Sequence, residues 1–150
     1  GVASLAQAET LVEVPNEVRE LLDGFPEGSL TVALRAHDTL DPRLGGDSVA
    51  IRVVAHPRAK RLLEATGPLT ATSANRSGES PVNDCEEAAR LLLAYGDAIE
   101  CVSGTCPGES PSTLIVWYSV CDSTESRDIE VLREGVVSEK EVRAWLRRRT

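Results

Sequence analysis

Hydrophobic and polar positions along the chain follow two different periods, which predicts helices interleaved with strands. Apolar residues recur every three or four positions in five segments, a spacing typical of helices with one buried face. These helical segments are residues 3–12, 17–25, 57–66, 85–95 and 139–149. Short apolar runs rich in strand-forming residues predict six strands, at residues 29–36, 48–54, 68–73, 98–103, 112–118 and 128–134. The interleaving predicts an α/β fold.

Two of the predicted helices begin with a capping box. In this pattern the N-cap side chain and the side chain three residues later each bond to the other's backbone. Asn83 with Glu86 predicts the start of one helix, which Gly96 is expected to end. Ser138 with Glu141 predicts the start of the last helix.

The length of the chain, 150 residues, suits one domain with a buried core. No internal repeat and no long linker divides it, so we expect residues 1–150 to form a single domain. Segment 119–128, SVCDSTESRD, is the expected mobile loop. No segment is apolar enough to predict a membrane span, and the first residues do not resemble a leader, so the expected location is cytoplasmic.

Charge and cysteine spacing limit the classes of function. The net charge of −8, from 24 acidic and 16 basic residues, argues against broad nucleic-acid binding through phosphate contacts. The four cysteines, at positions 85, 101, 106 and 121, show no C-x-x-C pair, and both histidines lie far upstream. We therefore read no protein metal site from the sequence and expect free thiols in a reducing compartment.

One polar stretch, TATSANRSGESP at residues 70–81, combines many hydrogen-bonding groups with few packing groups. It follows a predicted strand, and ligands of open α/β sheets bind where strands end. Its hydroxyls, its amide and its glycine could contact a ligand, but the same residue types also favour a simple hydrogen-bonded turn. The stretch alone leaves both interpretations open.

Three further polar positions interrupt or border apolar strands. Ser112 and Thr113 open the strand of PGESPSTLIVW, Arg133 precedes Gly135 in VLREGVVS, and Arg52 is an isolated charge in SVAIRVV. The chain has no G-x-S-x-G, P-loop or G-x-G-x-x-G motif. Arginines, hydroxyls and an amide bind anions, nucleotides and amino acids, and they promote reactions by positioning and by neutralising charge.

Taken in order, these stretches resemble the Sua5/YrdC (YwlC) family of threonylcarbamoyl-AMP synthases. The resemblance rests on TVALRA, SVAIRVVAHPRAKRLL, GPLTATSANRSGESP, PSTLIVW and VLREGVVS, and it runs from about residue 1 to about residue 140. It implies a YrdC-like twisted mixed sheet with flanking helices and a concave ligand cavity. It also implies synthesis of threonylcarbamoyl-adenylate from L-threonine, bicarbonate and ATP, with Mg²⁺ accompanying the ATP. The implied pathway is modification of adenosine 37 in tRNA, with a threonylcarbamoyl-transferase complex or the tRNA itself as partner.

The resemblance also implies which residues hold the substrates. On the ATP side it implies Ser48, Ser73, Asn75 and Arg133, of which Arg133 would reach the phosphate or nucleotide portion. On the threonine side it implies four residues, with the guanidinium of Arg52 meeting the substrate carboxylate; they are Arg52, Ala71, Thr72 and Ser112. The resemblance identifies no catalytic residue.

The chain departs from the family pattern in two places. Family members begin with about fifty more residues, including a P-T-x-T-x-Y-G-L segment and a K-x-R element, and neither motif occurs here. The absence of methionine agrees with a missing N-terminal portion, so we expect the chain alone to turn over poorly. In addition, FPEGSLT at residues 25–31 replaces an aromatic residue followed by P-G-P-L-T.

Three other functions stay open at this stage. The first is an RNA-binding module, against which the net charge and the scarcity of lysine and aromatic residues count. The second is the carbamoyl-adenylate activity of hydrogenase-maturation carbamoyltransferases, whose additional segments leave no trace in this sequence. The third is a non-catalytic relative of the synthases.

Overall fold

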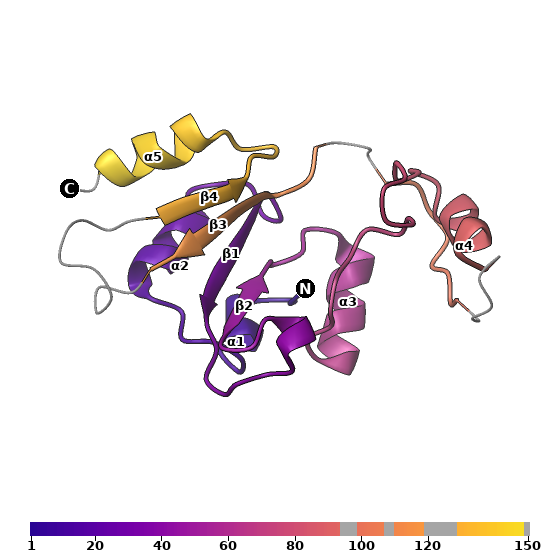
Figure 1. Ribbon diagram of the computed structural model, residues 1–150, viewed down its shortest axis with the longest axis horizontal. Coiled ribbons are helices and arrows are strands. Elements are labelled where there is room, and N and C mark those ends of the chain that lie inside the picture. The colour runs from indigo at the N-terminus through magenta and orange to yellow at the C-terminus, as the bar shows by residue number, and fades with distance from the viewer. Residues whose placement is uncertain (94–98, 107–109, 119–128, 149–150) are drawn as a thin grey trace. The chain divides into compact units, whose positions relative to one another are not determined.

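A computed structural model describes residues 1–93, 99–106, 110–118 and 129–148. The chain divides into two compact units (Figure 1). The first unit comprises Gly1–Thr70 and Pro111–Thr150, and the second unit comprises Ala71–Ser110. Each unit is described by itself. The expected single domain and concave cavity stay predictions.

The first unit is built on a four-stranded mixed sheet, as the sequence predicts. Its strands are β1 (Leu30–Arg35), β2 (Ser48–Ile51), β3 (Thr113–Trp117) and β4 (Ile129–Arg133), arranged in the order β2-β1-β3-β4. β1 and β3 are parallel, whereas the β1–β2 and β3–β4 pairs are antiparallel. Residues far apart in the sequence thus meet in the middle of the sheet.

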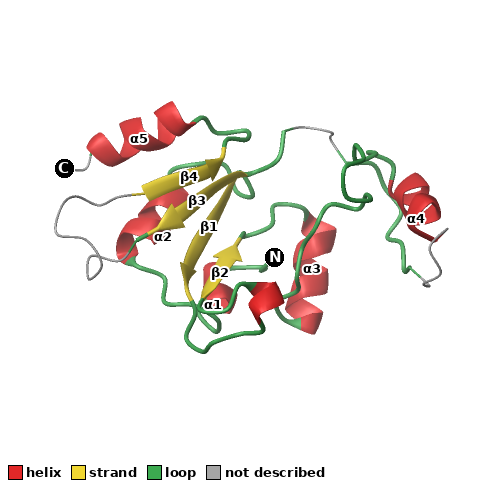
Figure 2. Cartoon of the chain, viewed as in Figure 1, coloured by secondary structure: helices red, strands yellow, loops and turns green. Residues whose placement is uncertain are grey.

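One face of this sheet is buried under helices (Figure 2). The helices of the unit are α1 (Leu5–Ala8), α2 (Asn16–Asp23), α3 (Pro57–Thr66) and α5 (Glu139–Arg147). Alternate residues of β1, beginning at Leu30, pack against apolar side chains of α2 and α5, including the fully buried Leu21 and Val142. Burial of these side chains, at roughly 25 cal/mol per Å², is the main source of stability for this face.

Two helices confirm the boundary signals of the sequence. α3 begins with Pro57 at its first position and is followed by Gly67, whose φ of 85° suits a residue without a side chain. α5 starts at the predicted capping box, in which the Ser138 and Glu141 side chains bond to each other's backbone. Local chemistry therefore defines these helix ends.

Two predicted strands are wrong. Residues 68–73 form no strand, because only Leu69 makes backbone bonds there, with Gly1, and its side chain is exposed. Residues 99–103, the described part of the other segment, also form no strand. Ile99 and Val102 are exposed, so the alternation in that segment has no buried face to stabilise it.

The second unit contains one described helix, α4 (Cys85–Leu93). The predicted cap at Asn83 is wrong by one residue, because the carboxylate of Asp84 accepts the bond from the backbone N–H of Glu87, at 2.8 Å. The backbone carbonyl of Asn83 instead accepts from Cys106, at 2.7 Å. Gly96 and the loop at 119–128 lie outside the described residues.

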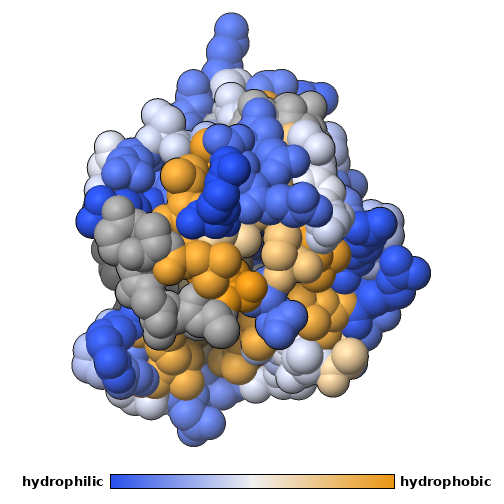
Figure 3. Space-filling view, turned by 90° about the vertical axis from the view of Figure 1, so that its right-hand side faces the viewer, coloured by the Kyte–Doolittle hydropathy of each residue, from blue (hydrophilic) through white to orange (hydrophobic). Residues whose placement is uncertain are grey.

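The remaining features of the described chain are its first helix and the apolar side chains that reach the surface. The first predicted helix, 3–12, is reduced to the single turn of α1, since Val12 leaves it to bridge to Ala36. On the face that Figure 3 shows, apolar side chains gather near the middle and hydrophilic ones surround them. In the second unit the large exposed ones are Leu91, Leu93, Ile99 and Val102. No described helix has the length and apolar character that a membrane crossing requires.

Candidate functional site

The sheet face that looks away from the apolar core carries the candidate site of the first unit. Side chains of neighbouring strand residues point to opposite faces, so β1 turns Thr31, Ala33 and Arg35 away from the core. The corresponding residues of β2, β3 and β4 are all half-buried or exposed; they are Ser48, Ala50, Leu114, Val116, Glu130 and Leu132. This face is therefore accessible to a ligand within the first unit.

A β-bulge aims Arg133 toward the accessible face. In β4, Ile129 and Val131 belong to the core face, so simple alternation would turn Arg133 inward as well. The pairing between β3 and β4 shifts between Leu114 and Ile115, and Arg133 consequently lies opposite Leu114. Bulges commonly re-aim a side chain in this way. The shift places an exposed arginine on the same face as Thr31.

The Arg133 side chain is held against the start of β3. Its guanidinium donates to the backbone carbonyl of Ser112 from Nη2 at 2.9 Å and from Nε at 3.3 Å. The hydroxyl of Ser112 in turn shares a hydrogen bond of 2.7 Å with the hydroxyl of Thr31, on β1. Thr31 and Arg133 thus meet at Ser112, the residue before β3, one through its hydroxyl and the other through its backbone carbonyl. We call this polar group the Arg133 cluster: Thr31, Ser112 and Arg133.

Thr113 fixes the backbone behind the Arg133 cluster. It is fully buried, and its hydroxyl donates to the carbonyl of Val137 while accepting from the N–H groups of Gly135, at 2.9 Å, and Val137, at 3.2 Å. Gly135 packs so closely that a Cβ there would overlap the carbonyl oxygen of Pro111. Thr113 therefore has a structural role, and the predicted ligand contact of its buried neighbour Ser112 stays a prediction.

Arg52 lies at the same end of the sheet as the Arg133 cluster. It directly follows Ile51, which pairs with Val32, so it continues β2 toward the level of Thr31. The register puts Arg52, Ser112 and Arg133 at this end of the sheet, with Arg52 beside β1 at one edge and Arg133 at the other edge, about 14 Å apart at three strand spacings. Each guanidinium suits a carboxylate or phosphate group.

Ser48 lies at the other end of β2. It pairs with Arg35, the last residue of β1. Arg52 is four positions further along the chain, which corresponds to roughly 13 Å along an extended strand. The structure therefore does not bring Ser48 to the Arg133 cluster. Its predicted contact with ATP stays a prediction.

In the second unit, the stretch at residues 71–80 is a hydrogen-bonded loop organised by Asn75. The Asn75 side-chain amide donates to the carbonyls of Arg76, at 2.8 Å, and Glu79, at 2.7 Å. Its carbonyl oxygen Oδ1 is buried and has no partner. Gly78, with a φ of 87°, completes the turn in which the Glu79 N–H bonds to the carbonyl of Arg76. Both amide donors of Asn75 are therefore committed to the loop.

Three other predicted residues of this loop, Ala71, Thr72 and Ser73, are exposed. They belong to the second unit, whereas Arg52, Ser112 and Arg133 belong to the first. A cavity shared by the loop and the Arg133 cluster stays a prediction. So do the nucleotide contacts of Ser73 and Asn75 and the threonine contacts of Ala71 and Thr72.

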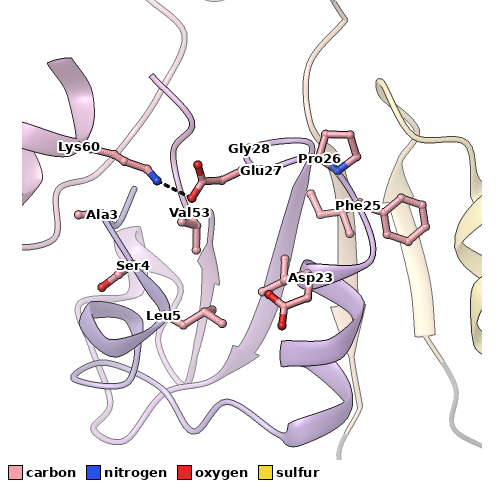
Figure 4. A pocket seen from close by; sticks show the side chains of 12 residues that line it. Ala3, Ser4, Leu5, Asp23, Phe25, Pro26, Glu27, Gly28, Val53 and Lys60 are labelled. Carbon is pink, nitrogen blue, oxygen red and sulfur yellow. Dashed lines mark hydrogen bonds and ion pairs between the residues drawn. The ribbon is translucent and has the colours of Figure 1, made fainter. Parts of the chain in front are cut away.

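A pocket of about 490 Å³ lies elsewhere in the first unit (Figure 4). Its wall includes the turn at residues 25–28, where Glu27 forms an ion pair of 2.5 Å with Lys60 of α3. The same turn bonds the Ser29 N–H to the Pro26 carbonyl and leaves the buried Ser29 hydroxyl without a partner. None of the sequence-predicted site residues lines this pocket.

Two observations describe the electrostatics of the first unit. Partial burial, and then the positive charge of Arg52, lower the pKa of the Gly1 amino group, so Arg52 exerts its charge close to Gly1. Among the described residues, no group of three or more His, Cys, Asp or Glu side chains could hold a metal ion.

Sequence reasoning missed Thr31 as a member of the site. It lies in the strand-forming run TVALR, where its residue type alone does not distinguish it from its neighbours. A signal was nevertheless present, since a threonine at the start of an amphipathic strand falls on the face opposite Leu30 and Val32. Its partner Ser112 comes from 81 positions further along the chain, and no local pattern pairs the two.

Comparisons with known proteins agree on one family. The sequence model of the Sua5/YciO/YrdC family, which is described as telomere recombination, matches residues 1–135. The threonylcarbamoyl-AMP synthase of Bacillus subtilis is 32% identical over 149 residues, which covers 95% of this chain and 40% of that protein. A relative in Mycobacterium tuberculosis is covered over 63% of its length. The chain thus spans only part of these curated relatives.

Solved structures give the same result. The crystal structure of Pyrococcus abyssi Sua5 complexed with L-threonine superposes with a TM-score of 0.76 at 30% identity, covering 95% of this chain and 41% of the other. Escherichia coli YciO superposes with a TM-score of 0.69 at 26% identity, covering 93% of this chain and 66% of the other. The mixed α/β architecture expected from the sequence is therefore confirmed.

Proposed function

The chain belongs to the Sua5/YciO/YrdC family, and from this we propose that it makes threonylcarbamoyl-AMP from L-threonine, bicarbonate and ATP. The observation that carries the proposal is the Arg133 cluster, in which an exposed guanidinium is held by the carbonyl of the buried Ser112, whose hydroxyl bonds to that of the half-buried Thr31. The names of the relatives and the L-threonine bound to Sua5 support the same substrates. The product would supply the threonylcarbamoyl group for tRNA modification.

In this proposal each end of the site recognises one substrate group. The Arg52 guanidinium binds the threonine carboxylate, and the Ser112 hydroxyl, oriented by Thr31, binds a polar group of the same substrate. Arg133 binds a phosphate through the guanidinium N–H groups that do not bond to the Ser112 carbonyl. For the loop of the second unit, the proposal assigns contacts with the nucleotide to Ser73 and Asn75; the Oδ1 of Asn75 is buried and has no partner.

The proposed adenylation reaction depends on charge neutralisation more than on proton transfer. A carbamate oxygen, formed from threonine and bicarbonate, attacks the α-phosphorus of ATP, and the bond to pyrophosphate breaks. Both reactants are anions, so fixed cations are needed to hold them in line. Arg52 and Arg133 provide two of these charges. Mg²⁺, when bound with ATP, supplies further neutralisation of the phosphates, and we propose no protein ligand for it.

Pyrophosphate release tests the proposal. The assay contains ATP, bicarbonate and L-threonine, and release is expected to stop when any one of the three is omitted. Arg133→Ala is expected to lower the rate at least about tenfold, because a charge-assisted contact to phosphate contributes roughly 1.5–3 kcal/mol. Arg143→Ala is the matched control, since Arg143 lies on α5 and pairs with Glu139 at 2.6 Å.

Because the chain spans only part of its relatives, the assay should include a longer version. This version carries a family P-T-x-T-x-Y-G-L and K-x-R segment before Gly1. The added lysine and arginine are expected to raise the rate by about a thousandfold, the size of effect typical of electrostatic groups in an active site. Equal rates for the two versions would contradict the predicted need for that segment.

RNA binding is the second candidate, and no described contact favours it. It predicts that tRNA binds to the chain without ATP or threonine and that salt weakens this binding steeply. The synthase proposal predicts no such binding at physiological salt, in agreement with the net charge of −8.

A further inference from the structure

Backbone pairing brings two cysteines of the second unit together. Asp84 and Thr105 form an antiparallel bridge. On its two sides the Cys85 N–H donates to the carbonyl of Gly104 at 3.0 Å, and the Cys106 N–H donates to the carbonyl of Asn83 at 2.7 Å. Cys85 and Cys106 therefore lie on adjoining segments, each one residue beyond a member of the bridged pair.

The thiol of Cys106 acts on that of Cys85. Partial burial, followed by a hydrogen bond between the two thiols, raises the pKa of Cys85. Cys85 is half-buried at the start of α4, whereas Cys106 and Cys101 are exposed, and all three are free thiols. Cys101 acts on Cys85 only through its charge, so Cys106 is the direct neighbour.

We propose that Cys85 and Cys106 form a reversible disulfide when the protein meets a low-molecular-weight disulfide such as oxidised glutathione. The backbone bridge already holds the two segments side by side, so a sulfur–sulfur bond of about 2.05 Å would form without a change in chain pairing. The bond would join the first residue of α4 to the segment 104–106, across the existing backbone bridge.

The exchange proceeds in two balanced steps. The exposed Cys106 thiol loses a proton to solvent, and its sulfur attacks one sulfur of glutathione disulfide, which releases one glutathione and leaves a mixed disulfide. Cys85 then loses its proton and attacks the Cys106 sulfur, which releases the second glutathione. The two protein thiols are oxidised by two electrons, and one glutathione disulfide is reduced to two thiols.

Two matched variants test this pairing. Cys101→Ser/Cys121→Ser keeps Cys85 with Cys106, and Cys106→Ser/Cys121→Ser keeps Cys85 with Cys101. Each is incubated natively with oxidised glutathione, alkylated and digested with trypsin. Cleavage after Arg76, Arg90 and Arg127 places Cys85 on one peptide and its candidate partners on another, so a disulfide is read by mass spectrometry as a linked pair.

We expect the linked pair to form at least about tenfold faster in the variant that keeps Cys106, because pre-positioned thiols react at a high effective concentration. In denaturant the two variants should react at similar rates, since the structure that selects Cys106 is then lost. Reduced glutathione in excess should reverse the link. Equal native rates, or a mixed disulfide with glutathione that persists, would overturn the proposal.

The unaltered chain provides a second measurement that does not depend on any substitution. After native oxidation, fragmentation of its linked tryptic pair locates the sulfur that Cys85 has joined. The proposal predicts Cys106 as the dominant partner. A dominant link from Cys85 to Cys101 or Cys121 would overturn it.

Discussion

The guanidinium of Arg133 donates two hydrogen bonds to the backbone carbonyl of Ser112, the shorter at 2.9 Å. This contact joins the end of β4 to the residue before β3, two segments that the sequence marks separately as ligand-binding. It also fixes the direction of an exposed arginine, so a phosphate would meet a guanidinium that is already oriented. Orientation before binding lowers the entropy cost of the contact.

Nucleotide binding should depend on Arg133 and on the loop at Asn75. We expect Arg133→Ala or Asn75→Ala to weaken binding of AMP or ATP at least about tenfold, which is the effect of losing 1.4 kcal/mol or more. Cys101→Ala and Cys106→Ala, measured under reducing conditions, should leave the affinity unchanged. Isothermal titration calorimetry gives both results. Equal affinity for the unaltered chain and Arg133→Ala would remove the assignment.

Stability of the first unit should depend on Gly135. A Cβ at this position would overlap the Pro111 carbonyl oxygen and lie 2.7 Å from the Ser112 carbonyl carbon, both of them backbone atoms that cannot turn aside. Gly135→Ala should therefore lower the free energy of unfolding by about 1–3 kcal/mol. The neighbouring Val136→Ala, at an exposed position, should change it by about 0.5 kcal/mol or less. Urea unfolding of both variants distinguishes packing strain from a general sensitivity of this turn.

Two threonines near Ser112 should respond differently to the same substitution. Thr113→Val removes a buried hydroxyl with three hydrogen bonds and should cost about 1–3 kcal/mol of stability. Thr31→Val removes one bond to Ser112 at a half-buried position, so its effect on stability should be smaller. Thr31→Val should instead weaken L-threonine binding, because Ser112 loses the partner that orients it. Thermal unfolding and threonine titration of both variants separate the structural role from the binding role.

The cap of α5 should make stability depend on pH. Hydrogen bonds from the Ser138 hydroxyl, at 2.6 Å, and the Ser138 N–H, at 2.8 Å, lower the pKa of Glu141 from its ordinary 4.5. Since the folded pKa lies below the unfolded one, this contribution is complete above pH 4.5 and is lost as the pH falls through the folded value.

Glu141→Gln gives the comparison, because glutamine can occupy a capping box but does not titrate. The stability advantage of the unaltered chain over Glu141→Gln, measured by urea unfolding, should be constant near neutral pH and shrink below pH 4.5. An advantage that stays constant into strong acid would show that the Glu141 charge does not contribute.

Much of the fold could be predicted from the sequence because several elements carry their own boundary chemistry. α3 begins at Pro57 and ends before Gly67, and α5 begins at its capping box, as expected. The failed strand at 68–73 shows the limit of this reasoning. Apolar residues can form a strand only where another strand or a core face accepts them, and Leu69 has neither a ladder partner nor burial. Whether a partner strand or a core face is available depends on tertiary structure and cannot be read from the local sequence.

The candidate site, too, was predictable only in part. The polar interruptions at Arg52, Ser112 and Arg133 were visible in the sequence, and the register of the sheet brings them to one end. The direction of Arg133 was not predictable, since a bulge between β3 and β4 reverses the face that simple alternation assigns. Thr31 could not be paired with Ser112 either, because parallel pairing of β1 with β3 creates that contact across 81 positions.

The most direct measurement of the central claim is detection of the adenylate product by mass spectrometry. The reaction contains ATP, L-threonine and ¹³C-labelled bicarbonate, and it is run on the chain, on the N-terminally extended version, and on that version with Arg133→Ala or Arg143→Ala. We predict threonylcarbamoyl-AMP that carries the label in its carbamoyl carbon and forms fastest in the extended version. Arg133→Ala should abolish most of it, and Arg143→Ala should not. Absence of a labelled adenylate from both the chain and its extended version, or equal formation with Arg133→Ala, would contradict the account.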